Sequence, residues 1–321
     1  MDDATLAALR TAASALFDLS FAGMAGALAT RGLAGDARAQ EARCRGMFLA
    51  CSLAAIAAGL GWMALQAIAV TELPPFAALA ASGGVIAGTQ FGRAWAVAML
   101  GLVSCAALAL AWRRRPAPLR RLWTTLAIVA AAHAGAGHAG ANGLGWLVAV
   151  TALHTLATGV WAGGVFAAAW LGVWLGVRSC DATISCCQAR PGTSDAAAWL
   201  ASPASADAVD TVRHAARLSA LATAALGVVV ATGAVCAWHG LGGTPAALAP
   251  ASDSSWGLVL DAKLALVAIA VALGGFNRLA VMPSLPAAWP RFVRVLRVES
   301  AVLIAVLVAA ALLANGEPPA V

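Results

Sequence analysis

The chain has 321 residues, of which 62% are hydrophobic and only 11% are charged. Soluble domains carry roughly 25% charged residues, so this composition lacks the polar groups needed to cover a surface exposed to water. The formal net charge is +6, but the basic residues lie in short loops between apolar runs, which is the pattern of a membrane topology signal. We therefore exclude a soluble globular domain and do not expect a nucleic-acid partner.

A helix needs roughly 20 apolar residues to cross the hydrocarbon core of a bilayer, and the chain contains eight such runs. The sequence thus predicts an all-α fold: a polytopic membrane helix bundle of about eight transmembrane helices, with residues 1–321 forming a single domain in contact with the lipid bilayer. The expected spans are 8–30, 46–71, 92–112, 119–138, 146–176, 214–238, 256–280 and 292–314.

Alternate loops carry 17 of the 20 Lys and Arg residues. By the positive-inside rule those loops are cytoplasmic, so both termini are predicted to be periplasmic. The amino terminus begins MDDATLAALR, which is acidic and continues into the first span, so no cleavable signal peptide is expected. We expect a multi-pass protein of a bacterial inner (plasma) membrane.

Two connections are unusually long. Residues 72–91 form an outer connection with no charge after Glu72, which we expect to pack onto the bundle. Residues 178–212 are predicted to be a flexible cytoplasmic loop because they are rich in Ser, Ala and Asp. This loop also contains Cys180, Cys186 and Cys187, and thiolates bind soft metals, but their spacing matches no standard metal site.

Ionisable groups inside membrane spans are costly, and each one is by default a candidate for function. His154 is expected roughly 12 Å below the outer surface, and Asp18 lies at a comparable depth, from the helical rise of about 1.5 Å per residue. With His138 at the outer mouth, these three side chains are candidate metal ligands. Glu299 is expected in the inner half of the membrane. Asp261 and Lys263 lie two residues apart and cannot face each other on one helix.

His154, Thr158 and Trp161 follow one another at helical spacing and share one face of their helix. Imidazole binds copper and a tryptophan ring can lie over a cation, but an interhelical hydrogen bond is an equally good reading of His154 from spacing alone. For His133 a structural role is favoured, because it points about 140° away from His138. Glu299 either assists ion passage or pairs with Lys263 or an arginine.

Several short motifs occur in order along the chain. They are Thr89-Gln90-Phe91-Gly92 with Trp95, Gly137-His138-Ala139, the stretch from His154 to Gly164, the stretch from Trp256 to Lys263 with Asn277-Arg278 and Pro283, and Glu299. Together they resemble the copper resistance D (CopD-type) family of bacterial inner-membrane proteins, over nearly the whole chain. Asp18 is a departure, because related sequences commonly carry a histidine near this position. A carboxylate there suits Cu(II) better than Cu(I).

The resemblance implies copper transport from the periplasm to the cytoplasm, as part of copper homeostasis or resistance, with a copper ion of undetermined oxidation state. It also implies a periplasmic copper-binding partner of the CopC-like type. Carried over to this sequence, it makes His138 and His154 the leading copper ligands, with Asp18 as a third. Gln90, Trp161, Lys263 and Glu299 then become pathway or supporting residues.

Two other readings remain open. Paired histidines could ligate haem b in a membrane electron carrier, although His133, His138 and His154 are all biased towards the outer half. The protein could also deliver copper to envelope cuproenzymes without transporting it. No nucleotide-binding loop, nucleophile triad or phosphorylated-aspartate motif is visible, so we do not expect an enzyme.

Overall fold

The structure is a computed structural model that describes residues 2–33, 38–113, 118–141, 143–187, 203–240, 254–285 and 287–316. Every regular element in these ranges is helical, which confirms the all-α prediction. The elements in chain order are α1 (Asp3–Leu33), α2 (Arg38–Thr71), α3 (Pro75–Gly88), α4 (Gln90–Ala111), α5 (Leu119–Ala136), α6 (His138–Ala141), α7 (Gly145–Cys187), α9 (Pro203–Gly240), α11 (Ser255–Phe276), a π-helical turn η2 (Asn277–Val281), a 3₁₀ turn η3 (Met282–Ser284) and α12 (Trp289–Asn315).

Within the described ranges, seven helices are long and apolar enough to cross a membrane: α1, α2, α4, α7, α9, α11 continued by η2 and η3, and α12. The remaining expected span is α5, which forms a helix of 18 residues but is not among the seven. Its sequence explains the difference, because Arg120, Arg121 and His133 lower the hydropathy of this short helix. α5 nevertheless packs against α4 and α7 as part of the bundle.

Both long connections contain helix. α3 occupies most of the outer connection and packs against α2 and α4, where the sequence analysis expected that connection to lie on the bundle. α7 continues through Cys187 and α9 begins at Pro203, so both ends of the segment 178–212 are helical. Residues 188–202 lie outside the described residues, and so do the side chains of Cys180, Cys186 and Cys187.

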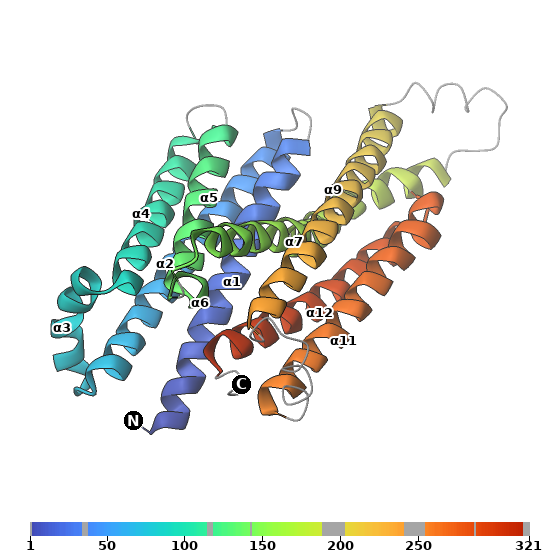
Figure 1. The fold of residues 1–321 in the computed structure, drawn as a ribbon. Coiled ribbons are helices and arrows are strands. Elements are labelled where there is room, and N and C mark those ends of the chain that lie inside the picture. The colour runs from blue at the N-terminus through green and yellow to red at the C-terminus, as the bar shows by residue number, and fades with distance from the viewer. Residues whose placement is uncertain are drawn as a thin grey trace.

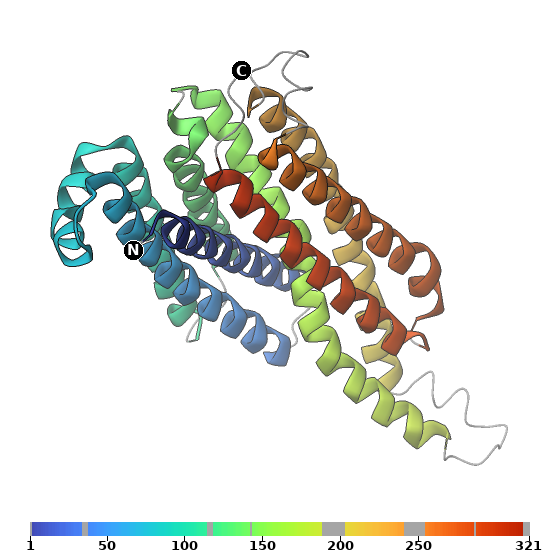
Figure 2. The ribbon, with the colours of Figure 1, turned by 90° about the horizontal axis from the view of Figure 1, so that it is seen from below.

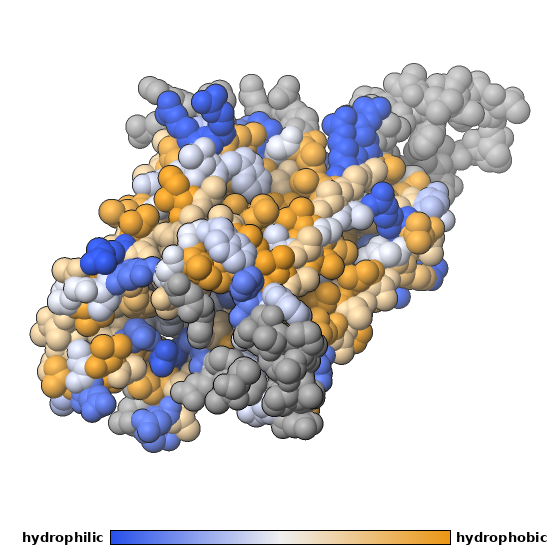
Figure 3. All heavy atoms as spheres, viewed as in Figure 1, coloured by the Kyte–Doolittle hydropathy of each residue, from blue (hydrophilic) through white to orange (hydrophobic). Residues whose placement is uncertain are grey.

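The helix ends are sorted between the two ends of the bundle. In Figure 1 the first turn of α1 and the last turn of α12 lie at the lower end, whereas α1 meets α2 and α4 meets α5 at the upper end (Figure 1). The upper end carries the basic connections. Figure 3 shows hydrophilic residues there, where α4 ends and α5 and α9 begin. Below them lies a middle region dominated by hydrophobic residues. This arrangement is typical of a protein embedded in a bilayer.

α1 is the central helix of the bundle. Of its most apolar window 72% is buried, against 11% for α9 and for α11, which lie at the periphery (Figure 2). A Cβ atom added to Gly26 of α1 would lie 1.9 Å from the carbonyl oxygen of Gly163 on α7. Glycine at both positions is therefore required for the two backbones to meet, as is common where membrane helices pack closely.

Two buried apolar clusters flank this contact. One joins α1, α2, α4 and α5 around Phe21, Phe48 and Leu126. The other joins α7, α9, η2 and α12 around Trp161, Phe292 and Leu303. The polar side chains predicted from the sequence are distributed around α1 and α7, between these clusters.

Candidate functional site

His154 contacts α9 through one nitrogen of its ring. Its Nδ1 atom lies 3.0 Å from Oγ1 of Thr232, and that hydroxyl donates its own hydrogen to the carbonyl oxygen of Val228 at 2.6 Å. Thr232 therefore accepts from His154, which assigns the proton to Nδ1 and leaves the Nε2 lone pair free. A hydrogen bond that holds one ring nitrogen and orients the imidazole in this way is characteristic of metal-binding histidines.

The same interface contains a thiol. Cys236 lies one helical turn from Thr232 on α9, and its Sγ atom is 3.7 Å from Oγ1 of Thr151 on α7. Gly233 gives the imidazole of His154 its space, since a Cβ atom there would lie 3.1 Å from the ring. The spacing of Thr232 and Cys236 at i and i+4 was the signal in the sequence that both face α7.

Asp18 is paired with a histidine that the sequence analysis assigned a structural role. Its Oδ1 atom lies 3.6 Å from Nε2 of His133 on α5. The ring of His133 is stacked on Phe17 with centroids 4.5 Å apart and lies 6.2 Å from the ring of Trp62. The structure thus places His133 beside Asp18. The side chain of the other candidate, His138, lies outside the described residues, although its backbone begins α6.

Asp18 and His154 lie at about the same depth on neighbouring helices. Gly159 of α7 faces Phe21 and Ala25 of α1, and Gly163 faces Ala22 one turn further on. This register sets His154 within about one helical turn of the level of Asp18.

Lys263 of α11 links the two pairs. Its side chain lies within electrostatic range of Asp18, His154 and Cys236, without forming an ion pair among the described residues. Across the described residues, no three His, Cys, Asp or Glu side chains are close enough to hold one metal ion together. The described residues therefore form two separate pairs, Asp18–His133 and His154–Thr232, with Lys263 within electrostatic range of both.

Gln90 lies apart from these pairs, at the start of α4. Its Nε2 atom donates to the carbonyl oxygen of Gly140 on α6 at 2.8 Å. Thr89 caps α4, because its hydroxyl accepts from the backbone N–H of Gly92 at 2.9 Å. A Cβ atom on Gly92 would lie 2.4 Å from the carbonyl oxygen of Val85, so only glycine fits there. The local chemistry of this motif holds α3, α4 and α6 together.

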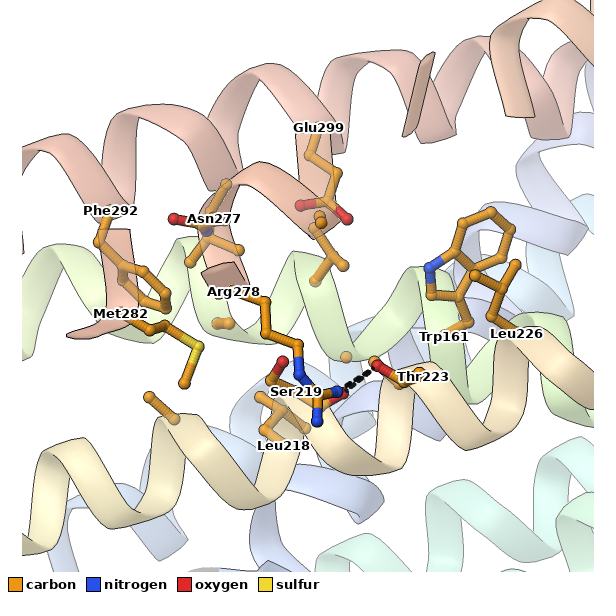
Figure 4. Close-up of a pocket in the computed structure, with 18 of the residues that line it drawn as sticks. Trp161, Leu218, Ser219, Thr223, Leu226, Asn277, Arg278, Met282, Phe292 and Glu299 are labelled. Atoms are coloured by element: carbon orange, nitrogen blue, oxygen red, sulfur yellow. Dashed lines mark hydrogen bonds between the residues drawn. The ribbon is translucent and has the colours of Figure 1, made fainter. Parts of the chain in front are cut away.

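A cavity of about 340 Å³ occupies the other half of the bundle, between α7, α9, α11 with η2, and α12. Its lining is largely apolar (Figure 4). In this view Trp161 lies at one end of the cavity, and Met282 and Phe292 lie at the other. Met282 belongs to the turn η3 between α11 and α12, and Phe292 lies in the first turn of α12, so the cavity extends from the basic end of the bundle to Trp161.

Two polar side chains of this cavity lack partners. Glu299 is 3% exposed and has no hydrogen bond or ion pair with any residue in the described part of the chain. Gly274 leaves room for it, since a Cβ atom there would lie 3.0 Å from Oε1 of Glu299. Asn277 is also 3% exposed and its Oδ1 atom has no partner. It begins the π-helical turn, a feature that frequently marks functional sites.

Arg278 closes one side of the cavity. Its guanidinium donates to the hydroxyl of Thr223 on α9 at 2.6 Å (Figure 4). α9 and α11 otherwise make few direct contacts, so this hydrogen bond spans the gap between them. Lys263, the other partner considered for Glu299, interacts with Asp18 and not with Glu299.

One face of α7 connects the outer pairs to this cavity. His154 lies at its outer end and Trp161, 5% exposed, lines the cavity two turns further in. Between them lies Thr158, whose buried hydroxyl has no hydrogen-bond partner among the described residues. An unpaired buried hydroxyl is costly, so its position on this face indicates a place for a polar or charged guest.

The fold and these residues define a multi-pass helical membrane protein with ionisable side chains at the levels of both membrane halves. Two family models then match the chain: "Copper resistance protein D-like, N-terminal domain" over residues 1–147, and "Copper resistance protein D" over residues 212–313. The chain belongs to the copper resistance protein D family, which implies a role in copper resistance. Comparison with curated proteins and with solved structures finds no match.

Proposed function

We propose that the protein carries copper ions through the inner membrane, from the periplasm to the cytoplasm. The observation that supports this most directly is the face of α7. The free Nε2 of His154, the unpaired hydroxyl of Thr158 and the ring of Trp161 follow one another towards the cavity that contains Glu299. An ion bound at His154 then needs to pass only Trp161 to reach a second polar region.

Capture takes place in the outer half. His154 binds copper through Nε2, and Asp18 is a second proposed copper ligand at a comparable level of the bundle. His138 is the third proposed ligand, by resemblance to the family. Imidazole suits both copper oxidation states, and a carboxylate favours Cu(II). Delivery to this end by a small periplasmic copper-binding protein is part of the proposal and rests on the family resemblance.

Release takes place through the cavity. Glu299 has no counter-charge among the described residues, so a cation entering the cavity would gain the full attraction of its carboxylate. The inward direction is part of the proposal and rests on the family resemblance. The basic residues lie at the end of the bundle where the cavity begins. By the positive-inside rule that end faces the cytoplasm.

The histidine geometry favours this proposal over a haem carrier. His133 and His154 project to different partners, Asp18 and Thr232, on different helices. Bis-histidine ligation of one haem needs two imidazole rings that face each other across a gap. The rings of His133 and His154 do not face a common gap.

The test is copper uptake into proteoliposomes that contain purified protein and a fluorescent copper chelator. The wild type should fill the vesicles with copper faster than protein-free vesicles, and His154→Ala should reduce uptake to the protein-free rate. His239→Gln is the matched control, because His239 lies at the end of α9 with its ring against Trp146. Wild-type uptake no faster than in empty vesicles would refute transport.

A further inference from the structure

Asp18 is a carboxylate inside a membrane span that has no hydrogen bond with any described residue. Its nearest charged or polar partner is Nε2 of His133 at 3.6 Å. Charge-assisted hydrogen bonds of this type measure about 2.7–2.9 Å, so the two atoms are close but not bonded. A carboxylate held this far from an imidazole, in a region where unpaired polar groups are costly, indicates that something belongs between them.

The separation fits a metal ion. With metal–ligand bonds of about 2.1 Å, typical for imidazole nitrogen and carboxylate oxygen on a divalent ion, atoms 3.6 Å apart subtend an angle of about 120° at the metal. Side-chain shifts of a few tenths of an ångström would bring this angle to tetrahedral or square-planar values. A linear two-coordinate Cu(I) site would need the atoms about 4 Å apart, so the geometry suits Cu(II) better.

The surroundings are those of a site rather than of a simple packing contact. The side chains of His133 and Asp18 keep 24% and 21% exposure, so other side chains do not fully enclose either of them. Phe17 holds the imidazole plane by stacking. Trp62, beside His133, has a buried indole N–H without a hydrogen-bond partner in the described part of the chain. This N–H can donate a hydrogen bond to metal-bound water.

We propose that Asp18 and His133 form a copper site of their own, separate from His154, at which Cu(II) is held between Oδ1 of Asp18 and Nε2 of His133. The identity of the metal rests on the proposed function, but the site itself rests on this geometry. Lys263 of α11 lies within electrostatic range of Asp18 but forms no ion pair with it.

The protein then holds two copper ions in its outer half, one at each pair. The test is the number of Cu(II) ions bound per chain in purified, detergent-solubilised protein, combined with electron paramagnetic resonance. We expect two ions for the wild type and one each for Asp18→Asn, for His133→Gln and for the double variant, with the same spectral component missing from all three. His154→Ala should also bind one ion but retain that component.

Melting temperature checks the fold of each variant, and His239→Gln serves as the histidine control. Asp18→Asn and His133→Gln test the site independently, so an unstable protein in one case leaves the other decisive. The proposed Asp18–His133 site is refuted if His133→Gln binds as much copper as the wild type. It is also refuted if the double variant loses more copper than either single variant. Two bound ions without vesicle uptake would instead retain the site and refute transport.

Discussion

The Nδ1 atom of His154 lies 3.0 Å from the hydroxyl of Thr232, whose hydrogen is already committed to Val228. The hydroxyl therefore fixes the tautomer of the imidazole. Because of this arrangement, the properties of Nε2 depend on a residue of another helix that carries no charge and binds no metal itself.

Thr232→Val should weaken copper binding at His154 by about 10–100-fold, the usual cost of losing a hydrogen bond to a ligand histidine. The valine has nearly the same shape, so the fold should be retained. Chelator competition in purified protein measures the affinity of this site. Thr232→Ser keeps the hydroxyl and should bind nearly as the wild type does. Equal affinity for the valine and serine variants would show that the hydrogen bond does not tune the ligand.

Glu299→Gln should leave copper binding in the outer half intact and reduce uptake several-fold. The substitution keeps the shape of the side chain but removes the charge that attracts a cation into the cavity. Bound copper and vesicle uptake are measured on the same preparation. The neighbouring Ser300→Ala is the control, since its hydroxyl only bonds the carbonyl of Leu296 on its own helix. Copper binding lost in folded Glu299→Gln protein would contradict this division of roles.

Lys263→Met should tighten copper binding at Asp18. The ammonium group competes with an incoming cation, and even at about 10 Å two unit charges repel by about 1.7 kcal/mol with an effective dielectric constant of about 20. This energy corresponds to more than tenfold in affinity. Lys263→Arg keeps the charge and should bind nearly as the wild type does. Weaker copper binding by the methionine variant, with an unchanged melting temperature, would mean that Lys263 supports the ion instead of opposing it.

The membrane bundle could be predicted from the sequence because each span is recognised from its own residues. An apolar run of about 20 residues is long enough to cross the bilayer as a helix. α5 shows where this reasoning weakens, since Arg120, Arg121 and His133 leave a helix that is part of the bundle but is short of apolar length. The depth of Asp18 and His154 was also predictable, because rise per residue depends on a single helix.

The pairing of side chains was not predictable in the same way. Asp18 meets His133 because α1 and α5 are neighbours, and helix adjacency is a property of the whole bundle. Thr232 and Cys236 were overlooked for a different reason: hydroxyls and thiols in apolar helices usually satisfy themselves or pack. Their importance becomes visible only when α9 is placed against α7. The π-helical turn at Asn277 likewise depends on packing and has no distinct sequence signal.

The topology prediction concerns both termini. A reporter enzyme that is active only in the cytoplasm should work when fused after residue 116 and fail when fused after residue 321. The first turn of α1 and the last turn of α12 lie on one side of the bundle, and the basic helix ends lie on the other (Figure 1). Activity of the fusion at the carboxy terminus would reverse the orientation, and the proposed direction of transport with it.

Gly163→Ala should destabilise the protein, whereas Gly164→Ala should have little effect. A methyl group on Gly163 would lie 1.8 Å from the carbonyl oxygen of Ala22, whereas one on Gly164 would make an ordinary contact of 3.5 Å with Leu218. The first clash is with backbone, which cannot rotate away, so α1 and α7 must separate. Overpacking of this kind costs about 1–3 kcal/mol.

Because α1 carries Asp18 and α7 carries His154, separating these helices should also lower copper uptake by Gly163→Ala even in the fraction of protein that remains folded. Thermal unfolding in detergent and vesicle uptake are measured for both variants under identical conditions. The two glycines are adjacent in sequence and the added group is the same, so the difference between the variants isolates the α1–α7 contact. Equal melting temperatures for the two variants would show that these helices do not approach as closely as Gly26 and Gly163 require.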